Sequence, residues 1–315
     1  MNKTIEAIKK EVKKVIVGQD ELIDSMLIGI ITGGHILVEG VPGLAKTTAI
    51  NSMAKALGLK FNRVQFTPDL LPSDITGVEV YNPKTSEFNV KKGPVFTNLL
   101  LADEINRAPA KVQAALLEVM QEKQVTIADN TYKLDKPFFV LATQNPVEQE
   151  GTYPLPEAQL DRFMLKVVVS YNTLDEEFEI VKRIADGKFE EIKPVANKQD
   201  IEELSKLAKE VHIDDALLKY IINIIGATRD PKAFGLDEIA EYIDFGASPR
   251  ASINMYNASR ALALIRGKDF VTPLDIAKIA PSVLRHRLIL NYKAQAKGIS
   301  ADEIISKIIK EIPAP

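Results

Sequence analysis

The segment at residues 40–48 has the residue types and the spacing needed to bind phosphate. Gly40 is followed by four residues and then by Ala45, Lys46 and Thr47, between an apolar run and a helical pattern. This is the spacing of a P-loop, in which backbone N–H groups and a helix N-terminus cradle a polyphosphate. Ala45 stands where the common pattern has glycine, so only a methyl group is added. The alternative is an ordinary strand-to-helix turn that happens to contain glycine and lysine.

The P-loop spacing favours a nucleotide phosphate bound together with Mg²⁺. In such a loop the lysine reaches the terminal phosphates, and the hydroxyl of Thr47 ligates the metal. The residues expected to contact the nucleotide are Gly40, Val41, Pro42, Gly43, Leu44, Ala45, Lys46, Thr47 and Thr48.

The acidic pair Asp103–Glu104 directly follows the apolar run 99–102. Asp103 is suited to the Mg²⁺ shell, and Glu104 is suited to polarise a water for attack on a γ-phosphate. By itself, an acidic pair after a strand more often interacts with a helix N-terminus. Because it occurs together with a P-loop spacing, we interpret the pair as the Walker B acids of a site that hydrolyses a nucleoside triphosphate.

Asn145 follows another apolar run, at 138–143. In a parallel sheet this end of the strand lies beside the phosphate site, so Asn145 could orient the attacking water. Without the other two motifs, an Asn–Pro turn would be the preferred interpretation.

Five apolar runs have the character of buried strands and alternate with helical patterns. They lie at 36–39, 63–66, 99–102, 138–143 and 165–169. This alternation predicts an α/β fold with a doubly wound parallel sheet between layers of helices, and with ligands at the carboxyl ends of the strands.

Two β-prone segments interrupt the alternation. The segment 77–90 is expected to form a hairpin or a loop insertion, and 125–134 is expected to form a hairpin with Asp129–Asn130 as its turn. These patterns are compatible with insertions that have a functional role and equally with hairpins that only extend the edge of the fold.

Beyond residue 170 the strand-like runs stop and helical periodicity continues to the end. We therefore expect a nucleotide-binding core at 1–172 and an all-helical lid at 173–315. Ser248, Thr272 and Ser300 are candidate N-caps in the lid, and proline follows the first two.

Composition excludes several classes of function. The net charge is −3 with both signs mixed, so nothing predicts a surface that wraps a polyanion. The chain has no cysteine, which excludes disulfides, thiolate metal sites and a cysteine nucleophile, and its three histidines have no metal-ligand spacing. We expect a soluble cytoplasmic protein without a membrane span and without a nucleic-acid partner.

Several motifs together closely resemble the MoxR family of AAA+ ATPases. The four that carry the resemblance are 40–48, 101–109, 144–146 and 155–163; further likenesses lie at 66–74, 151–154 and 246–250. The resemblance extends from about Gly18 to Pro313, and Ala45 is itself usual in this family.

The resemblance implies an AAA+ P-loop NTPase with a five-stranded parallel sheet sandwiched by helices, followed by a helical lid. It further implies a ring, a hexamer, with ATP bound between neighbouring subunits. The two β-prone segments would be the helix-2 insert near 77–92 and the pre-sensor 1 hairpin near 125–137.

The resemblance also assigns expected roles to single residues. Asn145 resembles the sensor 1 residue, Arg162 resembles an arginine finger that reaches a neighbour's γ-phosphate, and Arg250 resembles sensor 2. Val17 and Gly18 resemble the segment that lines the adenine pocket. Arg107 is a second candidate for the finger, and a surface ion pair is the plain alternative for each arginine.

The function implied is ATP hydrolysis that drives chaperone-like remodelling, maturation or assembly of a partner complex. The expected partners are a von Willebrand factor A domain protein and an unidentified client. Two alternatives stay open, namely a nucleotide-gated scaffold with incidental hydrolysis and a DNA-acting motor, which the mild acidity disfavours.

Overall fold

A five-stranded parallel sheet forms the centre of the structure. The computed structural model describes all residues except 1, 42, 147–150, 186 and 188–189. The strands follow the order β2 (Phe61–Gln65), β5 (Leu99–Asp103), β8 (Phe139–Gln144), β1 (Ile36–Glu39) and β9 (Leu165–Val168). All neighbours pair in parallel. The expected fold is confirmed, and each of the five apolar runs contributes one strand.

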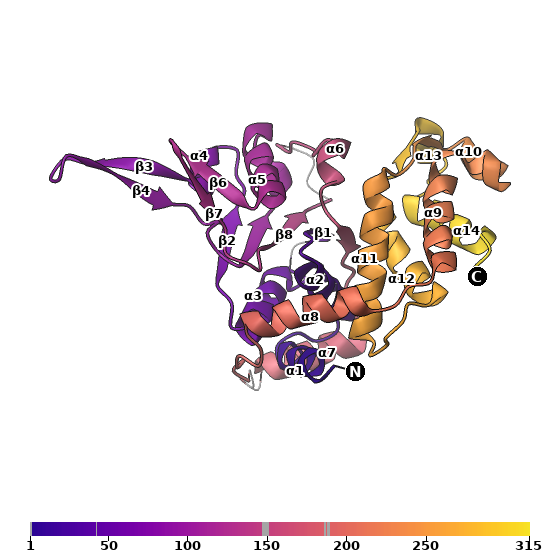
Figure 1. Cartoon of the computed structure of the whole chain (residues 1–315), viewed down its shortest axis with the longest axis horizontal. Coiled ribbons are helices and arrows are strands. Elements are labelled where there is room, and N and C mark those ends of the chain that lie inside the picture. Colours follow the sequence, from indigo (N-terminus) through magenta and orange to yellow (C-terminus); the bar gives the residue numbers. More distant parts are fainter. Residues whose placement is uncertain (1, 42, 147–150, 186, 188–189) are drawn as a thin grey trace.

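Helices cover both faces of this sheet (Figure 1). Along β1, Ile36 and Val38 pack with α1 (Lys3–Val12), α2 (Asp20–Thr32) and α3 (Lys46–Ala56), whereas Leu37 packs on the opposite side with α5 (Ala110–Glu122). Successive residues of a strand point to opposite faces, so a strand buried on both faces must be apolar throughout. The short elements α4 (Pro72–Thr76) and η1 (Ile105–Arg107) flank α5.

Both β-prone insertions form antiparallel hairpins. β3 (Gly77–Asn82) pairs with β4 (Glu87–Lys92), and this hairpin extends away from the body (Figure 1). β6 (Gln124–Ile127) pairs with β7 (Asn130–Lys133). The second turn is therefore Ala128–Asp129 and not Asp129–Asn130, because Asn130 already pairs with Ile127 and Ala128 adopts a φ of 50°.

The chain after β9 is mainly helical. Its helices are α7 (Leu174–Ala185), α8 (Lys198–Glu210), α9 (Asp215–Arg229), η2 (Pro231–Phe234), α10 (Asp237–Ala240), α11 (Pro249–Ile265), α12 (Pro273–Leu284), α13 (Tyr292–Ala296) and α14 (Ala301–Glu311). The short helix α6 (Glu157–Leu160) lies just before β9. Ser248, Thr272 and Ser300 cap α11, α12 and α14 as expected. The domain boundary near residue 172 stays a prediction, since α8 packs against α2 of the core as well as against α11.

One feature of this region differs from the expected all-helical lid. β10 (Ile243–Phe245) and β11 (Ile289–Leu290) form a short antiparallel ladder. Strands this short show no alternating pattern, so periodicity could not predict them. Among the described residues, no helix has both the length and the apolar character needed to cross a bilayer.

Candidate functional site

The carboxyl ends of β1, β5 and β8 open into a pocket of about 390 Å³. Because the three strands are parallel, the polar residues that follow them meet at one edge of the sheet. The expected site residues that line the pocket are Gly43, Leu44, Ala45, Lys46, Thr47, Thr48, Asp103, Glu104 and Asn145. Residues more than a hundred positions apart are thus brought into one cavity.

The loop at 40–48 connects β1 to α3. Ala45 adopts a left-handed conformation, with a φ of 54°, and α3 begins at Lys46. The Lys46 ammonium donates a hydrogen bond to the carbonyl of Gly40 over 2.7 Å. Burial lowers the pKa of Lys46, an effect that the carboxylates of Asp103 and Glu104 oppose. Gly40 and Val41 lie at the start of the loop, outside the pocket lining, and Pro42 lies outside the described residues.

A single hydroxyl organises the two acids. Thr143 at the end of β8 donates to Asp103 Oδ1 over 2.7 Å and accepts the backbone N–H of Glu104 over 2.8 Å. Glu104 itself has a φ of 55°, which turns the chain out of β5. The acids are therefore held from the neighbouring strand as well as by their own.

Two side chains of β2 also hold the acids. Arg63 donates to Asp103 Oδ2 over 2.7 Å, and Gln65 donates to Glu104 Oε2 over 2.8 Å. Arg107 forms an ion pair with Glu104 at 3.2 Å. Arg63, Gln65 and Thr143 were not predicted from the sequence. A usable signal for the first two was that polar residues alternate with apolar ones in the strand expected at 63–66.

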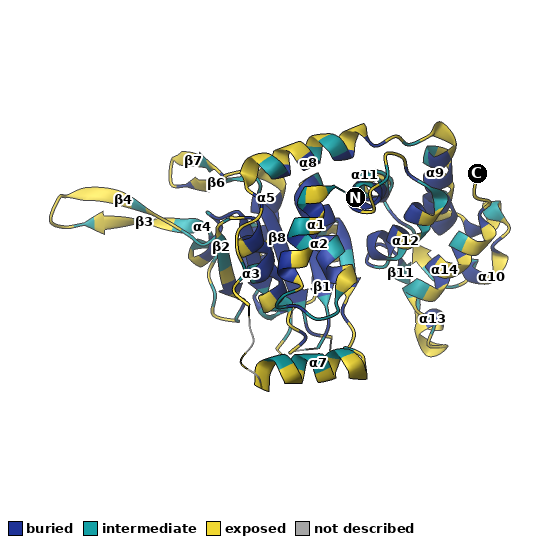
Figure 2. Cartoon of the chain, turned by 90° about the horizontal axis from the view of Figure 1, so that it is seen from below, coloured by how far each residue is buried: buried dark blue, intermediate teal, exposed yellow. Residues whose placement is uncertain are grey.

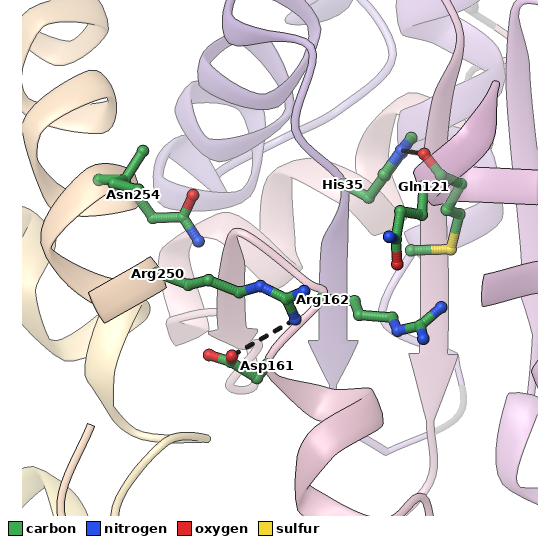
Figure 3. Close-up of a pocket in the computed structure, with 8 residues that line it drawn as sticks. His35, Gln121, Asp161, Arg162, Arg250 and Asn254 are labelled. Carbon is green, nitrogen blue, oxygen red and sulfur yellow. Dashed lines mark hydrogen bonds and ion pairs between the residues drawn. The ribbon is translucent and has the colours of Figure 1, made fainter. Parts of the chain in front are cut away.

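Arg162 and Arg250 lie in a different pocket, of about 280 Å³, together with His35 (Figure 3). His35 precedes β1 and Arg162 precedes β9, and these parallel strands pair with Ile36 opposite Leu165. This pocket is therefore at the amino edge of the sheet, whereas the loop at 40–48 follows the carboxyl end of β1. The structure brings Arg162 and Arg250 together with each other and not with Lys46 of the same chain.

Asp161 joins the elements around this second pocket. Its carboxylate accepts hydrogen bonds from Ser248 Oγ over 2.9 Å and from Arg287 Nε over 2.7 Å, and Arg250 approaches to 3.6 Å. Arg162 donates to the carbonyl of Leu117 over 3.1 Å. Sequence analysis assigned no role to Asp161 or Arg287, because a long-range ion pair leaves no local pattern.

Val17 and Gly18 lie in the turn between α1 and α2, outside the lining of the first pocket. Asn172 Nδ2 donates to the carbonyl of Val17 over 3.0 Å, and Gln19 Nε2 donates to the carbonyl of Ser170 over 3.1 Å. This turn is thereby fixed to the segment that follows β9.

Comparison with known proteins decides the family. Residues 35–165 match the model of the ATPase family associated with various cellular activities, and residues 237–308 match the AAA lid domain. Chaperone MoxR1 of Mycobacterium tuberculosis is 47% identical over 312 residues, which cover 99% of this chain and 82% of the relative. The chain belongs to the MoxR-type AAA+ ATPases.

Other relatives of this MoxR-type ATPase agree. The protein YeaC of Bacillus subtilis is 42% identical over 97% of this chain and 93% of its own length. A crystal structure of a putative ATPase from Cytophaga hutchinsonii is 53% identical, with a TM-score of 0.94, over 99% of this chain and 95% of that one.

The first pocket of this MoxR-type ATPase fits a magnesium nucleotide. It offers the hydroxyl of Thr47 and the carboxylate of Asp103, which are oxygen ligands of the kind that Mg²⁺ prefers. The described residues contain no group of three or more His, Cys, Asp or Glu side chains that could cage a metal. Mg²⁺ that accompanies a nucleotide is usually held by one or two protein ligands together with substrate phosphates and water.

Proposed function

We propose that this MoxR-type ATPase hydrolyses ATP to ADP and phosphate in the pocket at the carboxyl edge of the sheet. The observation that supports it best is the meeting of Lys46, Thr47, Asp103 and Glu104 in one cavity. Lys46 would bind the terminal phosphates, and the loop N–H groups would hold the rest of the triphosphate. Val17 and Gly18 would contribute to the adenine pocket.

Each of the polar residues has a proposed part in hydrolysis. Thr47 and Asp103 would hold Mg²⁺, which neutralises charge on the phosphates when it is bound. Glu104 would take a proton from the water whose oxygen attacks the γ-phosphorus, while the bond to the β–γ bridging oxygen breaks and ADP leaves. Asn145 would orient that water.

The second pocket supports action between subunits. Arg162 and Arg250 lie at the edge of the sheet opposite the phosphate loop, so they would serve the nucleotide of a neighbouring subunit. A head-to-tail contact of this kind closes into a ring, and we propose a hexamer. A guanidinium placed at the neighbour's γ-phosphate would neutralise the charge that develops during transfer.

We propose that the cycle drives chaperone-like remodelling, maturation or assembly of a partner complex. The relative from Mycobacterium tuberculosis is itself named a chaperone. A von Willebrand factor A domain protein and an unidentified protein client are the proposed partners.

Glu104→Gln tests the hydrolysis proposal. The amide cannot take the proton of water, so phosphate release should fall by about 100-fold or more. Binding of a fluorescent ATP analogue should be retained, because Lys46 and the loop are unchanged. Glu203→Gln, an exposed carboxylate on α8, is the matched control and should keep full turnover.

The same variant separates the motor from the scaffold. A Glu104→Gln protein that no longer hydrolyses ATP but still supports maturation of the client would show that nucleotide binding alone suffices for this activity. Proteins that co-purify with this variant in the presence of ATP are candidates for the client.

A further inference from the structure

Helix α7 is amphipathic, but its apolar side faces solvent. Its apolar residues recur at helical spacing, and Leu174, Phe178, Val181 and Ile184 have 86%, 70%, 58% and 58% of their surface exposed. We call these four residues the outward face of α7. A surface helix of a globular protein normally turns its apolar stripe to the core. Figure 2 shows α7 at the margin of the molecule, with mostly exposed residues.

The side of α7 that faces the body carries Glu176, Glu179 and Arg183, together with the half-buried Ile180. Arg183 donates to the backbone carbonyls of Lys13 and Lys14 over 3.2 and 3.0 Å, and its Nε contacts Glu179 over 2.8 Å. Glu176 approaches Gly18 so closely that a Cβ at that glycine would overlap its carboxylate. Hydrogen bonds from the polar side therefore help to position α7, while the four side chains of the outward face stay exposed.

A contiguous exposed apolar face of this kind marks an interaction surface. The charges of α7 help to identify its partner. The helix carries four acidic residues, Asp175, Glu176, Glu177 and Glu179, against the two basic residues Lys182 and Arg183. Helices that lie on membranes are rich in Lys and Arg on their polar face, because lipid surfaces are anionic. The acidic balance of α7 disfavours a lipid surface and favours a basic protein surface.

The position of α7 points to a second copy of the chain. Its first turn adjoins the turn at residues 17–19, through Asn172 and Glu176. In the proposed ring the nucleotide lies between neighbouring subunits, so α7 lies at the margin of that contact. In that ring the face of the chain that carries Arg162 and Arg250 would meet the nucleotide edge of a neighbour, so the first-turn acids of α7 lie toward a basic surface.

We propose that a second copy of this chain covers the outward face of α7 in the ATP-bound assembly. The inference rests on the proposed ring and adds an element to it: an apolar contact whose position is fixed by the turn at residues 17–19. Nucleotide binding at that turn and burial of the outward face are then coupled, so assembly strengthens when ATP is bound.

The double variant Phe178→Gln/Val181→Gln tests this. The parent protein carries Glu104→Gln so that ATP persists, and assembly is followed by sedimentation velocity over a range of concentrations. The double variant should raise the protein concentration of half-assembly by about tenfold or more, because two large apolar side chains lose their cover. Lys182→Gln, on the same helix but outside the outward face, should leave it unchanged.

Two further measurements show whether the double variant stays folded and whether the outward face becomes buried on assembly. Because the four side chains are exposed in the single subunit, the dilute double variant should bind a fluorescent ATP analogue as the parent does and unfold at the same temperature. Since the chain has no cysteine, Phe178→Cys accepts a single environment-sensitive fluorophore. Its emission should shift to the blue when ATP and protein concentration promote assembly.

The results separate this inference from the proposed ring. An unchanged assembly midpoint, in a parent that does form rings, overturns the role of α7 and leaves the ring standing. A parent that never assembles overturns both. Loss of ATP binding by the dilute double variant shows that the face supports the nucleotide turn instead. Binding of the parent, but not the double variant, to phosphatidylglycerol vesicles with unchanged assembly shows a lipid surface instead.

Discussion

Thr143 is the residue through which β8 reaches the two candidate acids on β5. Its hydroxyl donates to Asp103 and accepts the N–H of Glu104, and its side chain is almost fully buried. The hydroxyl touches neither the phosphates nor the water in the proposed mechanism. It is a positioning residue, and its loss should affect turnover more than nucleotide binding.

We expect Thr143→Val to lower kcat by about 10- to 100-fold, because the carboxylates lose their fixed placement. The unpaired N–H of Glu104 should also lower the free energy of unfolding by about 1–3 kcal/mol. Affinity for a fluorescent ATP analogue should stay nearly constant. Thr143→Ser keeps the hydroxyl and should keep most of the turnover; equal losses in both variants would contradict the proposed role.

His35 makes stability depend on pH. Its Nδ1 accepts the N–H of Val140 over 3.0 Å, which places the ring proton on Nε2, 3.1 Å from the carbonyl of Met120. Burial lowers the pKa of His35 to about 4, against about 6.5 in an unfolded chain. Between these two values the unfolded chain binds more protons than the folded one, so this contribution to stability is present above about pH 6.5 and is lost as the pH falls toward 4.

Unfolding in urea at several pH values tests this. His35→Gln should flatten the decline in the free energy of unfolding between about pH 6.5 and 4 by up to about 1.4 kcal/mol per pH unit. Its stability at neutral pH should be lower than that of the parent, because two buried hydrogen bonds are disturbed. His212→Gln, at an exposed position, should retain the steep decline; a similar slope in all three proteins would refute the assignment.

At the scale of elements, α12 begins on a buried carboxylate. Asp275 is fully buried and accepts hydrogen bonds from the N–H and hydroxyl of Thr272, while Arg266 and Lys268 pair with it at 2.7 and 3.0 Å. The same side chain thus closes the capping box of α12 and fixes the loop that leads from α11. These two helices pack together in the helical region.

Asp275→Asn should lower the free energy of unfolding at pH 7 by about 3 kcal/mol, because two cations lose a buried counter-charge. Chemical denaturation measures the loss. Asp269→Asn, an exposed carboxylate in the same loop, should change stability by less than about 0.5 kcal/mol. Equal effects of the two substitutions would show that burial of Asp275 contributes little.

At the scale of the whole molecule, the two candidate pockets lie at opposite edges of one sheet. Within one subunit, the phosphate loop and the candidate fingers are separated by the length of the strands. They are therefore too far apart to act on the same nucleotide. Specific activity should rise with protein concentration through the range in which subunits assemble. Constant specific activity on dilution below that range would show that one subunit is complete.

Mixing two inactive variants tests the same geometry. Lys46→Ala removes the phosphate ligand and Arg162→Ala removes the finger, and each protein alone should be nearly inactive. In a random one-to-one ring, about one quarter of the contacts combine an intact Lys46 with an intact Arg162, so turnover up to about one quarter of the original is expected. No recovery on mixing would place the finger within its own subunit or rule out Arg162.

The sequence by itself determined the fold class and most of the lining of the first pocket. Each of the predicted segments, 40–48, 103–104 and Asn145, lies at the end of a strand or directly after it. Parallel strands bring their carboxyl ends together. The position of each segment after its strand, and the rule that ligands bind at the carboxyl ends of parallel strands, were enough to place them side by side. The five strands could be predicted for the same reason, since residues buried on both faces form apolar runs.

Only the tertiary structure decided the rest. Arg63, Gln65 and Thr143 became part of the site through the register between strands, and Asp161 met Arg287 and Ser248 through packing of distant helices. The solvent-facing apolar side of α7 likewise emerged only when the polar contacts of Arg183 fixed its rotation. These facts depend on which distant surfaces meet, and no local pattern of residue types records that choice.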